Sequence, residues 1–141
     1  MRTRWKGLAA ALAFTLFTMA GAPARGEDDV AQGRKYYVRY CSSCHGLAAD
    51  GKGPIAPILK VSPSDLRRLA QRHGSPLPLD KIARFMDGSR PVTGHGNSDT
   101  PVWGKRFHET GPDTVDRQKA MRARVDAVLA YLASLQLKPK R

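Results

Sequence analysis

The chain has only two cysteines among its 141 residues. A zinc site built from thiolates needs further ligands at similar spacing. The histidines His73, His95 and His108 stand singly, which disfavours that kind of site. No run of alternating apolar and polar residues precedes the first cysteine, so the βαβ context of a thioredoxin-like redox site is also missing. Acidic residues are scarce as well, 12 against 24 lysines and arginines, and no internal repeat or low-complexity tract is visible.

The two cysteines belong to the sequence Cys41-Ser42-Ser43-Cys44-His45, a pattern typical of c-type haem attachment. One turn of chain places both sulfurs where they can form thioethers with two vinyl groups at one edge of a porphyrin. The imidazole of His45 would then lie under the ring centre, where it can bind iron as the proximal ligand. We therefore predict one covalently attached haem c per chain, bound by Cys41, Cys44 and His45, with His45 as the metal ligand.

The first 24 residues have the pattern of a secretory signal peptide. Three basic residues within the first six are followed by an uncharged apolar run over residues 7–20 and by Ala22-Pro23-Ala24. We expect residues 1–24 to be a signal peptide that is cleaved after Ala24. The alternative is an uncleaved membrane anchor, but about 16 uncharged residues are few for a span of ~20. Export suits the haem motif, since bacteria attach haem to such thiols after secretion, and it predicts a periplasmic location.

Residues 25–141 are predicted to form one monohaem domain. Removal of residues 1–24 takes away three basic groups and no acidic one, so the formal net charge falls from +12 to +9. This excess favours partners with acidic docking surfaces, and any membrane contact is expected to be peripheral. A generally solvated basic surface explains the charge equally well. We expect no nucleic-acid partner, because an exported protein rarely meets nucleic acid.

Helical periodicity and capping residues predict an all-α fold. Helices are expected over residues 28–41, 62–73, 79–87 and 115–136. The second is expected to begin with Ser62 as its N-cap, with a proline at the first helical position. The last carries the clearest apolar stripe, which consists of Met121, Val125, Val128, Leu129, Leu132 and Leu135.

Residues 46–54 hold three glycines and a proline, which predicts a loop. A carbonyl near Pro54 is expected to accept a hydrogen bond from His45 and so fix the orientation of its ring. After this loop, Ile55, Ile58 and Leu59 are expected to pack beside the porphyrin or to join the core. A second long irregular stretch, residues 89–104, is expected to be functional because of its length.

The chain resembles the class I c-type cytochromes, particularly small bacterial ones. Besides the haem motif, the resemblance is carried by Gly33, Tyr37, Val128, Tyr131, Gly51-x-Gly53-Pro54 and Pro101-Val102-Trp103-Gly104. It covers nearly all of residues 28–136. It implies a compact class I cytochrome c fold, in which the N- and C-terminal helices cross and two shorter helices and long loops surround the haem.

The chain departs from this family at the second axial ligand of iron. The family usually has a methionine directly before the Pro-Val-Trp-Gly segment, and here that position is Thr100. A threonine hydroxyl is a poor ligand for haem iron. The preferred expectation is an open or water-bound site, and the next is ligation by His95. Met86 and Met121 are further candidates, although core packing is the expected role of both.

The leading functional hypothesis is single-electron transfer in the periplasm between exported redox proteins, with no catalytic residue and no enzymatic activity. The alternative, motivated by Thr100, is a haem domain whose open distal site binds or senses a small ligand. A third hypothesis, a thiol oxidoreductase without haem, uses only Cys41 and Cys44.

Overall fold

The computed structural model describes residues 25–92, 94–95 and 114–138. These residues form helices and contain no strand, only an isolated bridge at Val92. The elements in chain order are α1 (Arg25–Tyr40), α2 (Ser42–His45), η1 (Ala56–Ile58), η2 (Leu66–Arg68), α3 (Leu69–His73), α4 (Leu79–Met86) and α5 (Val115–Ser134). The predicted all-α fold is confirmed.

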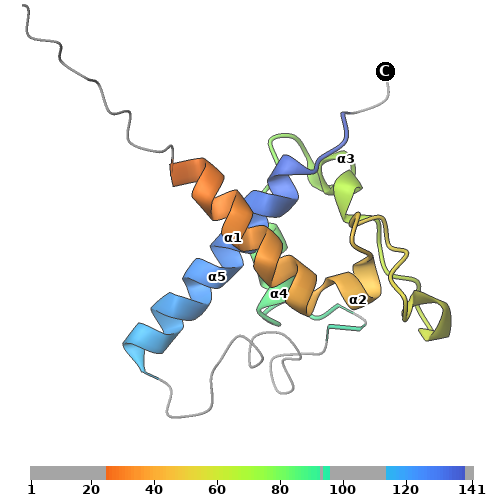
Figure 1. The fold of residues 1–141 in the computed structure, drawn as a ribbon, viewed down its shortest axis with the longest axis horizontal. Coiled ribbons are helices and arrows are strands. Elements are labelled where there is room, and N and C mark those ends of the chain that lie inside the picture. Colours follow the sequence, from red (N-terminus) through yellow and green to blue (C-terminus); the bar gives the residue numbers. More distant parts are fainter. Residues whose placement is uncertain (1–24, 93, 96–113, 139–141) are drawn as a thin grey trace, which may run out of the picture.

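Helices α1 and α5 cross in direct contact (Figure 1). The crossing is close because Gly33 has no side chain: a Cβ atom there would collide with the backbone carbonyl of Ala127. A glycine inside a helix costs about 1 kcal/mol relative to alanine, and at this position the close helix contact offsets that cost. One turn later the rings of Tyr37 and Tyr131 pack with centroids 5.3 Å apart. The expected pairing of the first and last helices is therefore confirmed.

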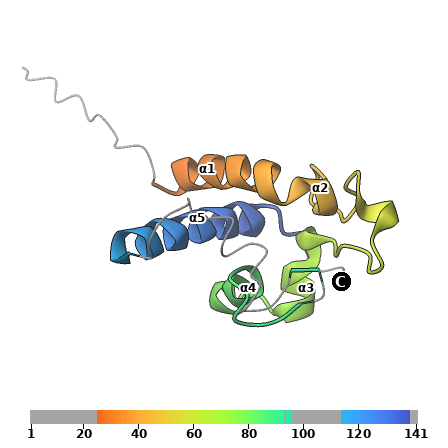
Figure 2. The same cartoon turned by 90° about the horizontal axis from the view of Figure 1, so that it is seen from below.

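The core lies between α5 and its neighbours. Figure 2 shows α1 on one side of α5, with α3 and α4 on the other. Tyr37, Val128 and Leu129 are the largest fully buried side chains. The predicted stripe of α5 is confirmed in its centre, since four of its members are buried. The two end members, Met121 and Leu135, are only partly buried against this core.

The second predicted helix begins later than expected. Residues 62–65 are not helical, and the helical segment starts at Leu66, as η2 followed directly by α3. Asp65 has an extended backbone, and its side chain caps the segment by accepting a hydrogen bond from the backbone N–H of Arg67. The prediction of Ser62 as the N-cap was therefore wrong, because the aspartate caps the helix three residues further on. The predicted end at Gly74 is confirmed.

Several predictions lie outside the described residues. They concern the signal peptide over residues 1–24, Thr100, the Pro101-Val102-Trp103-Gly104 segment and His108. Across residues 25–92, 94–95 and 114–138, no helix is both long and apolar enough to cross a membrane.

Candidate functional site

The two cysteines and His45 lie on one short helical stretch that follows α1. The backbone N–H of Cys41 bonds to the carbonyl of Tyr37 at 2.8 Å, and that of His45 bonds to the carbonyl of Cys41 at 2.9 Å. These bonds continue the helical backbone from α1 into α2, so that Cys41 and Cys44 lie about one helical turn apart. Both thiols and the imidazole consequently line the same cavity.

This cavity has a volume of about 490 Å³. Small-molecule and cofactor sites span roughly 300–1,000 Å³. Its walls come from α1, α2, α3, α4 and α5, from the segment 59–66 and from Val92, Gly94 and His95, and most of the lining side chains are apolar. These are Tyr37, Leu59, Val61, Leu66, Leu69, Ile82, Phe85, Met86, Val92, Val128 and Leu132. An apolar cavity with two thiols and a buried imidazole in one wall fits a porphyrin that is attached through thioethers.

The ring of His45 is held by a backbone carbonyl. Its side chain is buried, and Nδ1 donates to the carbonyl oxygen of Ser64 at 2.9 Å. A carbonyl can only accept, so Nδ1 carries the hydrogen and Nε2 keeps the lone pair that binds a metal. Burial is the main cause that lowers the pKa of His45, with smaller contributions from nearby His95 and Arg72. The neutral ring, which is the form that ligates iron, is therefore favoured.

The prediction that a carbonyl near Pro54 accepts the hydrogen bond from His45 was wrong. The loop over residues 46–54 binds the backbone of the motif instead of its ring. The N–H of Gly51 bonds to the carbonyl of His45 at 2.8 Å, and the N–H of Gly53 bonds to that of Cys44 at 3.0 Å. A Cβ atom at position 53 would collide with the backbone of residues 43 and 44. The loop therefore fixes where α2 lies, and the ring partner comes from a later segment.

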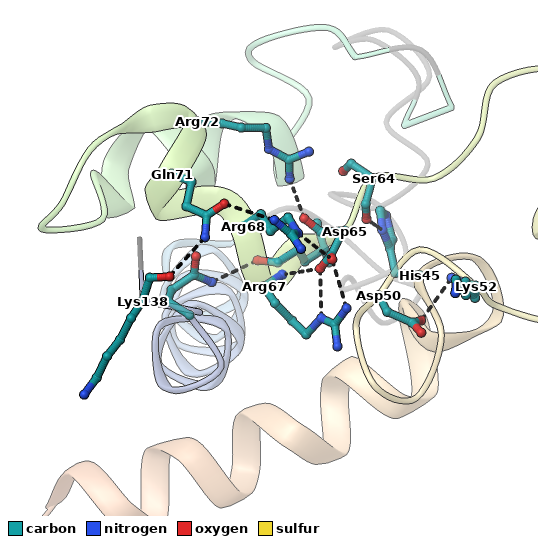
Figure 3. A network of polar contacts seen from close by, with 12 residues as sticks. His45, Asp50, Lys52, Ser64, Asp65, Arg67, Arg68, Gln71, Arg72 and Lys138 are labelled. Carbon is teal, nitrogen blue, oxygen red and sulfur yellow. Dashed lines mark hydrogen bonds and ion pairs between the residues drawn. The ribbon is translucent and has the colours of Figure 1, made fainter. Parts of the chain in front are cut away.

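A network centred on Asp65 holds that later segment (Figure 3). The carboxylate accepts hydrogen bonds from the guanidinium of Arg67 at 3.0 and 2.9 Å and from Arg68 at 3.3 Å. The backbone carbonyl of Asp65 accepts from Arg72 at 2.5 Å. The hydrogen bonds from Arg67 are the main cause that lowers the pKa of Asp65 to about 2. Since Asp65 adjoins Ser64, we infer that the network positions the carbonyl that orients His45.

Sequence reasoning missed this role of Asp65. The arginines two, three and seven residues later were visible in the sequence. They are the signal that could have identified the carboxylate as the centre of an ion-pair cluster.

Cys41 lacks the lowered pKa of a reactive redox thiol. Burial, and secondarily the neighbouring Cys44, raise the pKa of Cys41 to about 12. Reactive redox cysteines have a lowered pKa, because the thiolate is the nucleophile. The described residues contain no group of three or more His, Cys, Asp or Glu side chains that could hold a metal ion.

The structure separates the candidates for the second axial ligand. His95 and Met86 both line the cavity, whereas Met121 packs against the core and is absent from the cavity lining. His73 also lines the cavity, at the end of α3, with its ring centroid 5.6 Å from that of Phe85. Thr100 lies outside the described residues.

Of the three apolar residues after the loop, only one lies where it was predicted to lie. Leu59 lines the cavity as expected. Ile55 and Ile58 neither line the cavity nor join the core, and Ile58 is 82% exposed. Their prediction was wrong because η1 (Ala56–Ile58) turns the chain outward over Gly53, where the backbone N–H of Ala56 bonds to the carbonyl of that glycine.

Comparison with protein families places these features in context. The model of the family described as Cytochrome c matches residues 30–136, which include the cysteine–histidine motif, most of α1 and the whole of α5. No curated protein and no solved structure matched the chain. The family and the motif together imply one covalently bound haem c.

Proposed function

This chain belongs to the cytochrome c family, and we propose that it carries single electrons between exported redox proteins in the periplasm. Haem-based electron transfer follows from the family and from the motif of Cys41, Cys44 and His45. Members of the family are typically electron carriers and not enzymes, so no residue is assigned as acid, base or nucleophile. The observation that carries the proposal is the position of this motif in the wall of the apolar cavity.

Each residue of the site has a distinct role in this proposal. Cys41 and Cys44 hold the haem through thioethers, and Nε2 of His45 binds iron. The carbonyl of Ser64 fixes the tautomer and the orientation of that imidazole. The haem supplies the one-electron chemistry when it is bound. The apolar lining excludes water, and such a dry environment is one of the means by which a protein tunes a haem potential.

Basic residues near the cavity support docking to acidic partners. Arg72 lines the cavity itself, and Lys60 lies between two lining residues, Leu59 and Val61. Arg90 places its guanidinium over the ring of Phe85, 5.1 Å from the centroid. All three basic side chains are on exposed residues. Positive charge beside the site of electron exchange attracts negatively charged surfaces and orients the encounter.

Salt dependence tests the proposed partner class. The rate of electron exchange would be measured with a negatively charged and with a positively charged inorganic oxidant over a range of salt concentrations. We expect the first rate to fall and the second to rise with added salt, because screening weakens attraction and repulsion alike. Two rates that do not change with salt would refute acidic docking and leave electron transfer itself standing.

The expected signal peptide supports the periplasmic location. The test is fractionation of cells that express the full chain, together with sequencing of the N-terminus of the product. We expect haem-containing protein in the periplasmic fraction that begins at Arg25. Haem-loaded protein found in the membrane fraction with Met1 retained would contradict the proposed cleavage and location.

A further inference from the structure

We propose that His95 is the second axial ligand of the haem iron, so that iron is bound by the imidazoles of His45 and His95. The inference rests on the proposed function, because it requires a haem attached at Cys41 and Cys44. It replaces the open or water-bound site that the sequence favoured.

The two imidazoles are separated by the distance that one metal ion between them requires. Their ring centroids lie 5.9 Å apart, and the ring planes are inclined by 71°. A metal–imidazole bond is about 2 Å long and a ring nitrogen lies roughly 1 Å from its centroid, so two imidazoles on opposite sides of one metal have centroids about 6 Å apart. The rings are therefore spaced for a shared ion, and at this angle they are not stacked on each other.

Both rings are also anchored through the same nitrogen. Nδ1 of His95 lies 3.0 Å from the carbonyl oxygen of Phe85, as Nδ1 of His45 lies 2.9 Å from that of Ser64. Each carbonyl fixes the hydrogen on Nδ1 and leaves Nε2 as the nitrogen with a lone pair. A backbone carbonyl that holds the other N–H is the usual support of a metal-binding histidine. Because both rings are held in this way, the inference rests on more than the short distance between them.

The position of His95 is set by backbone contacts of the segment after α4. The N–H of Arg90 bonds to the carbonyl of Arg84, and the N–H of His95 bonds to that of Val92, both at 2.9 Å. Gly94, with φ of +92°, supplies the left-handed conformation that turns the chain just before the histidine. The segment therefore folds back on the end of α4 and brings His95 into the lining of the cavity.

Other candidates in the cavity lack these features. Met86 lies next to Phe85 and packs against the core cluster. The ring of His73 packs against Phe85 rather than against His45. These two residues therefore provide matched control variants, one for the thioether and one for a second imidazole in the same cavity.

Spectroscopy of the haem-loaded full protein tests the proposal. For the unchanged protein we expect the magnetic-resonance and near-infrared signatures of low-spin ferric haem with two imidazole ligands, and only slow carbon monoxide binding after reduction. His95→Ala should lose that low-spin signal and bind carbon monoxide rapidly, and added imidazole should restore the signal. His73→Ala and Met86→Leu should keep it.

Three results would overturn the assignment. The first is a sulfur-to-iron charge-transfer band in the unchanged protein, the second is an unaltered spectrum in His95→Ala, and the third is a high-spin or rapidly ligand-binding unchanged protein. The spectrum of the unchanged protein decides the question even if His95→Ala does not fold. A failure of the proposed function would differ from a failure of the His95 assignment, because the product would then carry no covalent haem.

Discussion

The two loops next to the cavity histidines differ in how they are held. Residues 46–53 follow His45 and have Gly46, Ala49 and Gly53 buried. Of the described residues that precede His95, namely 88–92 and 94, four are exposed and only Gly88 is buried. The first loop bonds to the backbone of the haem motif, whereas the second bonds mainly to itself and to the end of α4. The loop after the haem-attachment motif is thus held by packing, and the loop before His95 is held by a few backbone hydrogen bonds. We therefore expect the first loop to tolerate substitutions less well than the second.

The largest expected effect lies at the helix crossing that supports the attachment side. Gly33→Val drives a branched side chain into the carbonyl of Ala127, and separation of α1 from α5 should destabilise the protein by about 3 kcal/mol or more. Chemical denaturation measures this loss. Gly26→Ala in the same helix is the matched control, because nothing lies within 4 Å of the added atom. A Gly33→Val protein as stable as the control would contradict the close crossing.

The two loops can be compared directly through one glycine in each. Gly53→Ala should cost about 2–3 kcal/mol and lower the yield of haem attachment, because the added atom meets the backbone of the motif. Gly94→Ala has open space around it and suffers only the strain of positive φ, about 1–2 kcal/mol. Unfolding free energies and haem content measure both effects. If the Gly94 variant proved the more damaging one, the contrast between the loops would be reversed.

A smaller effect is expected at Tyr37, which links α1 to the attachment loop. Its buried hydroxyl donates to the carbonyl of Gly46 at 2.6 Å. Tyr37→Phe leaves that carbonyl without this donor and should cost about 1–2 kcal/mol in unfolding free energy. Tyr36→Phe is a control in the same helix, on a residue that is only partly buried. Equal stability of Tyr37→Phe and the unchanged protein would show that the bond does not anchor the loop.

The smallest expected effect is the pH dependence contributed by Asp65. Its pKa in the folded protein, about 2, lies below the ordinary value of 3.8, so the folded state favours the carboxylate. The resulting stabilisation is present above about pH 4 and is lost as the pH falls towards 2. We expect Asp65→Asn to remove about 1 kcal/mol at neutral pH, a value reduced for the exposure of its arginine partners.

The control for this prediction is Asp80→Asn. The Asp80 carboxylate is 89% exposed and pairs with Arg122 on the surface, so its loss should matter little. Unfolding curves between pH 2 and pH 7 would be compared for the three proteins. An Asp65→Asn protein that keeps the full acid-induced loss of stability would assign that loss to other groups.

Local patterns in the sequence predicted much of the fold. Helical periodicity identified the first and last helices, because it is visible in neighbouring residues. Their crossing was implied by the resemblance to class I c-type cytochromes, and the structure confirms it. The haem motif is equally local. The predicted helix ends differ from the observed ones by a few residues: α1 begins at Arg25 rather than residue 28, and α5 ends at Ser134 rather than residue 136.

Contacts between distant residues could not be predicted in this way. The carbonyl that holds His45 belongs to Ser64, 19 residues later, and its placement depends on the cluster around Asp65. Likewise, the approach of His95 to His45 depends on the bonds of Arg90 and His95 to backbone carbonyls of α4. A sequence pattern gives the length of such a loop, but it does not show which backbone carbonyl will accept a hydrogen bond from the histidine.

The central claim is that one haem is fastened to Cys41 and Cys44 with His45 as its iron ligand. Mass spectrometry of the denatured, exported protein tests this most directly, because thioether bonds survive unfolding. The account predicts a mass that exceeds that of the polypeptide by one haem, and a loss of this increment in the double variant Cys41→Ala, Cys44→Ala. A product that weighs no more than its amino acids would contradict it.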